Sequence, residues 1–363
     1  MNIYALLVVL ILISAVVFNG NQPKSLKFVI VASLLMFAVL GLRDATLIGV
    51  DTTSSYRGVF LKMSMSSWSE VLEAHRAKNT GFYLMTKAFS EFISNDYQTY
   101  ITVLAAFVSL CFGRLIYRYS PSPLQSILYH FGLLLYMFQF SALKQCLAMS
   151  ILMLAFDPLI ERKPIKFILL VLLAGQFHMP ALVFLPSYWL TKIQPGKKYL
   201  ILLGVVLVLT YLFRNQLLNL MNSLYGDEEE AVDLSGVQFL RTKALIMVII
   251  VAAAALFRVP TPEDKTYSSL FVLMCLAIIF QTFCGYDNTF ERLADYFFQF
   301  SVIFLALVFD RRAYRKGLFN WRFAQTAETV APILFCSFGV YRFLDYISSN
   351  AIFFLPYRFF FQS

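Results

Sequence analysis

A histidine lies in the middle of an apolar stretch of the chain, at position 178. The stretch spans residues 167–190, and two prolines, Pro180 and Pro186, follow the histidine. An imidazole at the depth of a bilayer is costly unless it faces a helix bundle or a water-filled cavity. The prolines interrupt the hydrogen bonds of a helix, which is tolerated where the freed groups meet protein or water. His178 is therefore either part of a site or a polar residue held between helices.

Three polar clusters lie at the borders of other apolar runs. They are Arg43, Asp44, Asp51 and Tyr56, then Lys144 and Gln145, and then Arg292 and Tyr296. Arg292 and Tyr296 are four residues apart and share one face if the segment is helical. Each cluster also has a purely structural interpretation. Arg43 could snorkel to the interface, Lys144 could be a solvated helix end, and Arg292 could pair with Glu291 or Asp295.

Cations and a histidine at a water–lipid border suit one class of ligand, a lipid-linked pyrophosphate. Fixed positive charges stabilise the phosphate that leaves when a sugar–pyrophosphate bond breaks, and a histidine can take a proton from an attacking sugar hydroxyl. We expect Arg43, Lys144 and Arg292 to hold the donor pyrophosphate. His178 would act as the base or orient the acceptor, and Asp51 would position its loop or a sugar hydroxyl. Further candidates for substrate contact are Asp44, Tyr56, Gln145 and Tyr296.

Other kinds of site find little support in the sequence. The chain has no Walker A and no G-x-G-x-x-G pattern, and its three histidines are far apart. The five cysteines show no C-x-x-C spacing, so we expect free thiols and neither a disulfide frame nor a metal site. Asp44 and Asp51 could hold a divalent ion as glycosyltransferase carboxylates do, but no third acidic ligand follows nearby. We expect no cofactor and no metal.

Composition places the chain in a membrane. It is 59% hydrophobic and only 14% charged, whereas soluble domains carry about 25% charged residues. The net charge of +9 comes from basic residues scattered through short loops. Such an excess reports membrane topology and anionic headgroups, not nucleic acid. No linker and no repeat divides residues 1–363, so one integral-membrane domain is the simplest prediction.

The apolar runs predict an all-α polytopic membrane protein with roughly 11–12 transmembrane or half-spanning helices. The expected runs are residues 3–18, 26–42, 99–117, 124–140, 143–160, 167–190, 199–213, 242–257, 267–284, 296–309 and 328–344. Residues 43–98 form the longest polar stretch, which we expect to be an extracytoplasmic loop carrying amphipathic helices. The tail at 351–361 is apolar but too short to span, so it is expected at an interface.

The basic loops should face the cytoplasm. An outside N-terminus satisfies all of them if residues 167–190 begin and end on the cytoplasmic side. This favours a hairpin that turns near His178, Met179 and Pro180 over a single tilted helix. The polar loop at 43–98, the start of the run at Leu143, the His178 turn, the acidic loop at 226–234 and the loop at 286–295 would then all open to the outer face.

The polar motifs also follow the order of a known family. They are R-D-A-T-L-I-G-V-D-T-T-S-S-Y from Arg43 to Tyr56, N-x-G-F at Asn79 to Phe82, K-Q-x-L-A from Lys144 to Ala148, F-H at Phe177 and His178, and R-x-x-x-Y from Arg292 to Tyr296. In this order the chain resembles the EpsG family of Wzy-like polysaccharide polymerases. The family usually has R-Q where this chain has Lys144 and Gln145, and lysine keeps the charge but loses the bidentate fork.

The resemblance implies joining of undecaprenyl-pyrophosphate-linked oligosaccharide repeat units into O-antigen, capsule or exopolysaccharide. It implies an inverting, metal-independent glycosyl transfer at the outer face of the bacterial cytoplasmic (inner) membrane, by a multi-pass fold related to GT-C enzymes. A chain-length regulator and a flippase would be the pathway partners. The alternatives are an O-antigen ligase-like transferase and a flippase or transporter of lipid-linked oligosaccharides, although the chain lacks the repeated halves of many transporters.

Overall fold

The computed structural model describes residues 2–19, 25–76, 78–193, 242–257, 263–283, 288–310 and 321–362, with short pieces between 204 and 216. These residues form helices and no β-strand. The chain divides into two compact units. The first unit contains residues 1–182 and 327–363, and the second contains residues 183–326. Each unit is described by itself.

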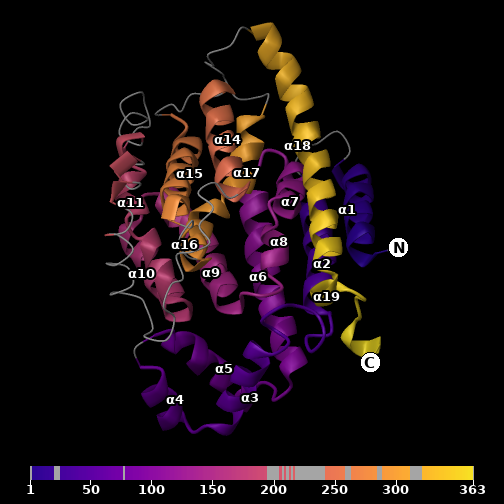
Figure 1. The fold of residues 1–363 in the computed structure, drawn as a ribbon, viewed down its shortest axis with the longest axis vertical. Helices are drawn as coiled ribbons and strands as arrows, with labels where there is room; N and C mark the ends of the chain where they lie inside the picture. Colours follow the sequence, from indigo (N-terminus) through magenta and orange to yellow (C-terminus); the bar gives the residue numbers. More distant parts are fainter. Residues whose placement is uncertain are drawn as a thin grey trace. The chain divides into compact units, whose positions relative to one another are not determined.

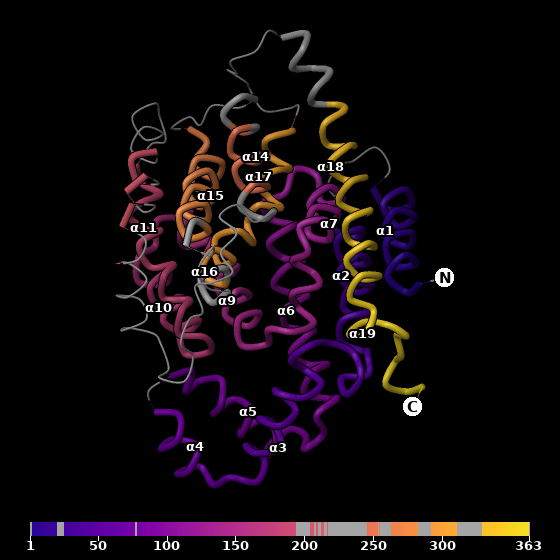
Figure 2. Tube along the Cα trace, in the orientation of Figure 1, coloured from indigo at the N-terminus to yellow at the C-terminus, as the bar shows by residue number. Residues whose placement is uncertain are grey.

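The first unit is a bundle of apolar helices that run along one direction (Figures 1 and 2). They are α1 (Ile3–Asn19), α2 (Leu26–Gly41), α6 (Tyr97–Tyr119), α7 (Pro123–Gly132), α8 (Leu135–Phe138), α9 (Leu143–Ile160), α10 (Pro164–Phe177) and α18 (Trp321–Ser349). Helix α2 packs on α1 and α6, and α9 packs on α6 and α10. Among the described residues, α6, α9 and residues 329–349 of α18 are long and apolar enough to cross a membrane. The all-α membrane class is thus confirmed.

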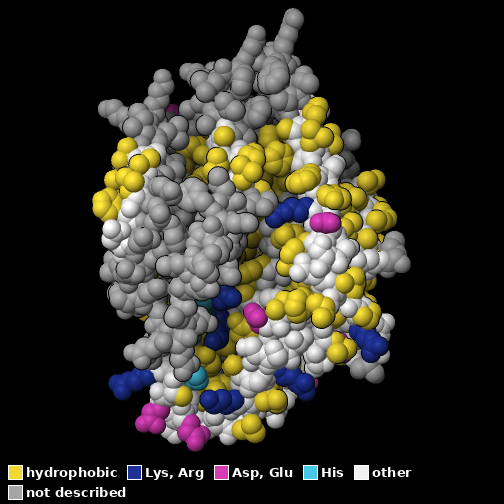
Figure 3. Space-filling model, in the orientation of Figure 1, with side chains coloured by type: hydrophobic (Ala, Val, Ile, Leu, Met, Phe, Trp, Pro, Cys, Tyr) yellow, Lys and Arg dark blue, Asp and Glu magenta, His cyan; other side chains and the backbone are white. Residues whose placement is uncertain are grey.

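A layer of three helices lies at one end of this bundle, below the others in Figure 1. These are α3 (Ser55–Met65), α4 (Trp68–Ala74) and α5 (Thr80–Phe92). Helix α5 buries one face, with Phe82 and Phe89 in the hydrophobic core beside Tyr100 of α6. Residues 43–98 therefore do contain helices, as predicted, while their side of the membrane stays a prediction. Figure 3 shows charged side chains gathered at this end and hydrophobic side chains along the bundle.

The opposite end of the first unit carries a cluster of ion pairs. Asp157 of α9 accepts hydrogen bonds from Arg114 and Arg118 of α6, and from the hydroxyl of Tyr119 at 2.6 Å. Arg118 also donates to Glu161 at 2.5 Å. These residues lie where the positive-inside argument expects a cytoplasmic loop, and here the charges are paired within the protein.

Two glycines allow α7 and α18 to cross at very short distance. A Cβ atom added to Gly132 would lie 2.4 Å from the Cα of Gly339, a distance at which backbone atoms would have to move. Next to the crossing, Arg342 donates a hydrogen bond to the carbonyl of Gly132 at 2.9 Å. Small residues at such a contact let helices in a membrane approach closely.

The C-terminal tail folds back onto the loop that follows α2. It contains α19 (Ala351–Phe354) and a 3₁₀ turn, η3 (Phe360–Gln362). The amide of Asp44 donates to the carbonyl of Arg358 at 2.9 Å, and the amide of Phe360 donates to that of Leu42 at 3.0 Å. The hydroxyl of Tyr357 donates to the carbonyl of Val39 at 2.9 Å. The tail is thus held by the protein itself.

The second unit contains α11 (Ser187–Leu190), α14 (Thr242–Phe257), α15 (Lys265–Phe283), α16 (Asn288–Phe298) and α17 (Ser301–Val308). Helix α15 packs on α14, α16 and α17. Aromatic side chains make several of these contacts, for example the stacked rings of Phe280 and Phe297, with centroids 5.4 Å apart.

Two predicted spans are wrong in their continuity. Residues 124–140 do not form one helix, because α7 ends at Gly132 and Leu134 has a left-handed backbone, with φ of 62°. Residues 296–309 are likewise interrupted between α16 and α17, and α16 already begins at Asn288. The predicted run at 199–213 and the acidic loop at 226–234 lie wholly or largely outside the described residues.

Candidate functional site

Lys144 occupies the first turn of α9, at the end of the bundle that α3–α5 cover. Its Nζ donates a hydrogen bond to the hydroxyl of Tyr83 at 2.6 Å. The same ammonium lies 4.5 Å from the ring centroid of Tyr83 and 5.3 Å from that of Phe82, a cation–π arrangement. Its backbone N–H points to the hydroxyl of Tyr56 at 3.5 Å. Among the described residues no carboxylate forms an ion pair with Lys144.

His75 stacks on the ring of Tyr83, the residue that accepts the hydrogen bond from Lys144. Its ring is nearly parallel to that of Tyr83, at 9°, with centroids 3.4 Å apart. The backbone of His75 is fixed by Thr80, whose hydroxyl donates to the His75 carbonyl at 2.6 Å. Burial, Lys144 and Lys62 all lower the pKa of His75 from 6.5, because each disfavours the charged imidazolium. The ring is therefore neutral at pH 7.

The predicted break at His178 is present in the structure. Helix α10 ends at Phe177, His178 has an extended backbone, and a 3₁₀ turn, η1 (Met179–Phe184), follows. A Cβ on Gly175 would lie 2.6 Å from Leu182, so the chain turns back against α10 directly after the histidine. Whether residues 167–190 return to the side where they began stays a prediction.

The start of α5 is fastened to this turn. The side-chain oxygen of Asn79 accepts a hydrogen bond from the amide of Met179 at 2.8 Å. Two residues later, a Cβ on Gly81 would lie 2.7 Å from the Cβ of Gln176, so only glycine lets the two segments approach this closely. The N-x-G-F motif thus joins the layer of α3–α5 to the His178 turn, and Phe82 fills the core behind it.

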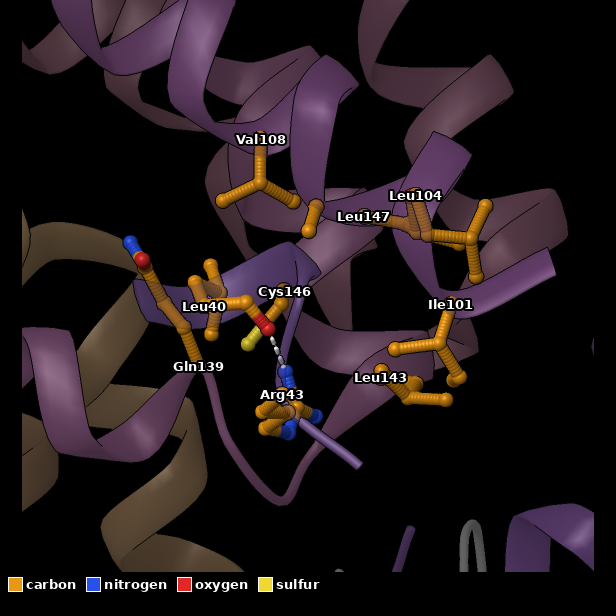
Figure 4. Close-up of a pocket in the computed structure, with 10 residues that line it drawn as sticks. Leu40, Arg43, Ile101, Leu104, Val108, Gln139, Leu143, Cys146 and Leu147 are labelled. Carbon is orange, nitrogen blue, oxygen red and sulfur yellow. Dashed lines mark hydrogen bonds between the residues drawn. The ribbon is translucent and has the colours of Figure 1, made fainter. Parts of the chain in front are cut away.

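The buried side chain of Arg43 donates its hydrogen bonds to backbone carbonyl groups. It is 1% exposed, and its guanidinium donates to the carbonyls of Leu40, of Ile48 at 3.1 Å and of Phe140 at 3.5 Å. It also lies 4.8 Å from the centroid of the Phe140 ring. The cavity beside it, drawn in Figure 4, is small and lined almost entirely by apolar side chains such as those of Leu104 and Leu147.

Asp44, Asp51 and Gln145 are also placed by the local fold. Asp44 is buried, and its carboxylate accepts from both the amide and the hydroxyl of Thr46, at 2.9 and 2.6 Å. Asp51 is half-buried, and its carbonyl accepts from the amide of Tyr56 at 2.9 Å. Gln145 is 2% exposed, in the first turn of α9. Of this group, Asp51 is the side chain most open to a ligand.

Arg292 and Tyr296 belong to α16 in the second unit. The segment is helical, but the two side chains differ, because Arg292 is exposed and Tyr296 is fully buried. Asp295 is buried beside them. The approach of Arg292 to Lys144 stays a prediction. The side chain of Glu291 and the loop at 284–287 lie outside the described residues.

The structure thus joins Lys144 and Tyr56 of the predicted site, and it adds two residues that sequence reasoning missed, Tyr83 and His75. His75 is counted in the sequence only as part of an amphipathic loop, far from the other histidines. The sequence signal that could have found them is the N-x-G-F motif at Asn79 to Phe82. It lies between His75 and Tyr83, and a simple surface turn would not require it. No group of three or more metal-ligating side chains occurs in the described part of the chain.

The model of the EpsG family matches residues 26–359, nearly the whole chain. No curated protein and no solved structure matches it.

Proposed function

We propose that this chain, which belongs to the EpsG family of Wzy-like polymerases, joins undecaprenyl-pyrophosphate-linked oligosaccharide repeat units into a polysaccharide. The reaction would take place at the outer face of the bacterial cytoplasmic membrane. The repeat units would arrive from a flippase, and a chain-length regulator would act on the product.

The observation that carries the proposal is the environment of Lys144. Its ammonium faces the phenyl ring of Phe82 and the ring and hydroxyl oxygen of Tyr83, and no carboxylate among the described residues neutralises it. A positive charge without an ion pair, at the head of a helix bundle, is suited to an anionic ligand at headgroup level. The pyrophosphate of a lipid-linked sugar is such an anion, and it lies at the depth of the lipid headgroups.

The reaction we infer is an inverting substitution at the anomeric carbon. The bond between that carbon and the pyrophosphate oxygen breaks, and the electron pair leaves with the pyrophosphate. The hydroxyl of the acceptor sugar forms the new bond from the opposite face and passes its proton to His178. Lys144 stabilises the charge that develops on the leaving group. No metal ion is required in this scheme.

The other predicted residues take supporting positions. Asp51 is the carboxylate that can meet a sugar hydroxyl, and Tyr56 borders Lys144 through its phenol. The side chains of Arg43, Asp44 and Gln145 are buried, so in this proposal they support the local fold and do not meet the ligand.

A single reconstitution tests the function. Purified protein in lipid nanodiscs is given a lipid-linked repeat unit, with neither ATP nor an ion gradient. We expect a ladder of lengthened products and release of the lipid pyrophosphate, and His178→Gln should reduce chain growth by about 100-fold or more if it removes the general base. Tyr341→Phe, at an exposed position of α18, serves as the control. Transfer to a lipid A-type acceptor only would instead indicate a ligase, and movement across the bilayer without chemistry a transporter.

A further inference from the structure

The phenol of Tyr83 has one hydrogen-bond role filled and one open. Its oxygen accepts from Lys144 Nζ at 2.6 Å, which leaves the O–H proton to be donated. No acceptor for that proton occurs among the described residues. An ammonium bound to a phenol oxygen withdraws electron density from the O–H bond and makes it a stronger donor, as in other charge-assisted pairs.

The ring of Tyr83 is also held in direction. His75 covers one face in a parallel stack, and Phe82 meets it edge-on with centroids 5.6 Å apart. Its backbone belongs to α5, whose start is tied to the His178 turn through Asn79. A donor fixed in this way needs no reorganisation when charge develops in front of it, which is the condition for strong electrostatic catalysis.

We propose that Tyr83 is a catalytic hydrogen-bond donor to the leaving pyrophosphate, that Lys144 acts on the reaction through it, and that His75 is a positioning residue for its ring. This rests on the proposed function. Tyr83 keeps its proton throughout, because the pyrophosphate leaves as an anion and needs only a donor. The acceptor proton goes to the base, and Lys144 remains an ammonium.

Tyr83→Phe isolates the hydroxyl. The variant keeps the ring that stacks on His75 and faces Lys144, and it removes only the oxygen. Loss of one fixed donor to a developing oxyanion lowers kcat by about 10²–10³-fold. We expect that loss in kcat, with KM for the lipid-linked repeat unit within about threefold and an unchanged Tm. A kcat within about threefold of wild type would overturn the proposal, and Tyr341→Phe is the matched control.

His75 is tested by two substitutions of different shape. His75→Phe preserves a flat ring over Tyr83, whereas His75→Ala removes it. If His75 only positions the phenol, the phenylalanine variant should retain kcat within about threefold, and the alanine variant should lose about tenfold or more. Equal, large losses in both variants would show that the imidazole takes part in the chemistry and would refute the positioning role.

Binding of the released product separates this inference from the proposed function. Undecaprenyl pyrophosphate carries the full charge of the leaving group, and a hydrogen bond to a charged group is worth about 1.5–3 kcal/mol. Tyr83→Phe should therefore weaken its binding by about tenfold or more. If the wild type makes no polymer but binds this lipid through Tyr83, the function is wrong and the site stands. If the wild type makes polymer and Tyr83→Phe binds the product as tightly as the wild type, only the inference is refuted. If the wild type neither makes polymer nor binds the product, the inference and the proposed function are both refuted.

Discussion

The hydrogen bond between Asn79 and Met179 is expected to hold the layer of α3–α5 against the His178 turn. Asn79 Oδ1 accepts from the Met179 amide at 2.8 Å, and Asn79 itself has a left-handed backbone, with φ of 57°. Asparagine tolerates this conformation better than most residues. Asn79→Ala should therefore remove an acceptor and also put at position 79 a residue that tolerates the left-handed backbone less well than asparagine.

The two costs can be separated. A buried amide left without its partner costs about 1–3 kcal/mol, and the left-handed conformation costs a residue such as alanine about 1–2 kcal/mol. Asn79→Gly carries the first cost without the second, and Asn79→Asp keeps an acceptor oxygen. The opening of the turn should increase from aspartate through glycine to alanine.

Hydrogen exchange in nanodiscs measures this opening at the peptide around residues 175–182. A loss of 1–3 kcal/mol corresponds to exchange of the Met179 amide that is about 5–150-fold faster. Asn79→Asp should stay near wild type. If Asn79→Ala and Asn79→Gly exchange at the wild-type rate, the tether does not hold the turn and the reasoning fails.

Three further predictions concern stability. Gly132→Ala forces a methyl group into the backbone of Gly339 and should lower stability by about 1–3 kcal/mol, which would be measured as a lower Tm in detergent. The control, Gly58→Ala, has open space around it and should keep the wild-type Tm. Equal Tm values for the two variants would contradict the close crossing of the helices. Arg43→Ala removes the guanidinium donor from the carbonyls of Leu40, Ile48 and Phe140, of which the last two also face the hydroxyl of Thr52. A loss of about 1–3 kcal/mol should lower folded yield and Tm together, and an inactive variant of wild-type Tm would show a direct role in binding. Because the pKa of His75 is lowered from 6.5, the folded state should lose stability as pH falls through 6.5 towards that lowered value; His75→Phe should remove this part of the pH dependence of Tm, and an unchanged profile would exclude it.

Hydropathy predicts most helices of this chain well, because a span needs a long apolar run and charges mark its ends. The break at His178 is also predictable, since Pro180 follows it. The interruption at Leu134 is not, because the run contains no proline there and leucine rarely adopts a positive φ. Hydropathy measures composition and carries no information on backbone direction.

The candidate site is predictable only in part, for a related reason. Lys144 stands out because it is a cation where the topology disfavours one. Tyr83 and His75 do not stand out, since a tyrosine and a histidine in an amphipathic segment are ordinary. Their importance arises because Tyr83 contacts a lysine 61 residues away and His75 stacks on Tyr83, which no local pattern encodes. Arg43 shows the converse, because its neighbours in sequence suggest a ligand and its neighbours in space are carbonyls.

Because the C-terminal tail packs on the loop that follows α2, this part of the protein can finish folding only after the tail has been synthesised. Tyr357 donates to the carbonyl of Val39 across a separation of 318 residues. At a synthesis rate of about 5–20 residues per second, roughly 15–60 s pass between the making of these two partners. The loop after α2 therefore enters the membrane long before the segment that completes it exists. A fusion that restrains the last residues should consequently delay maturation of the end of the bundle that carries Lys144.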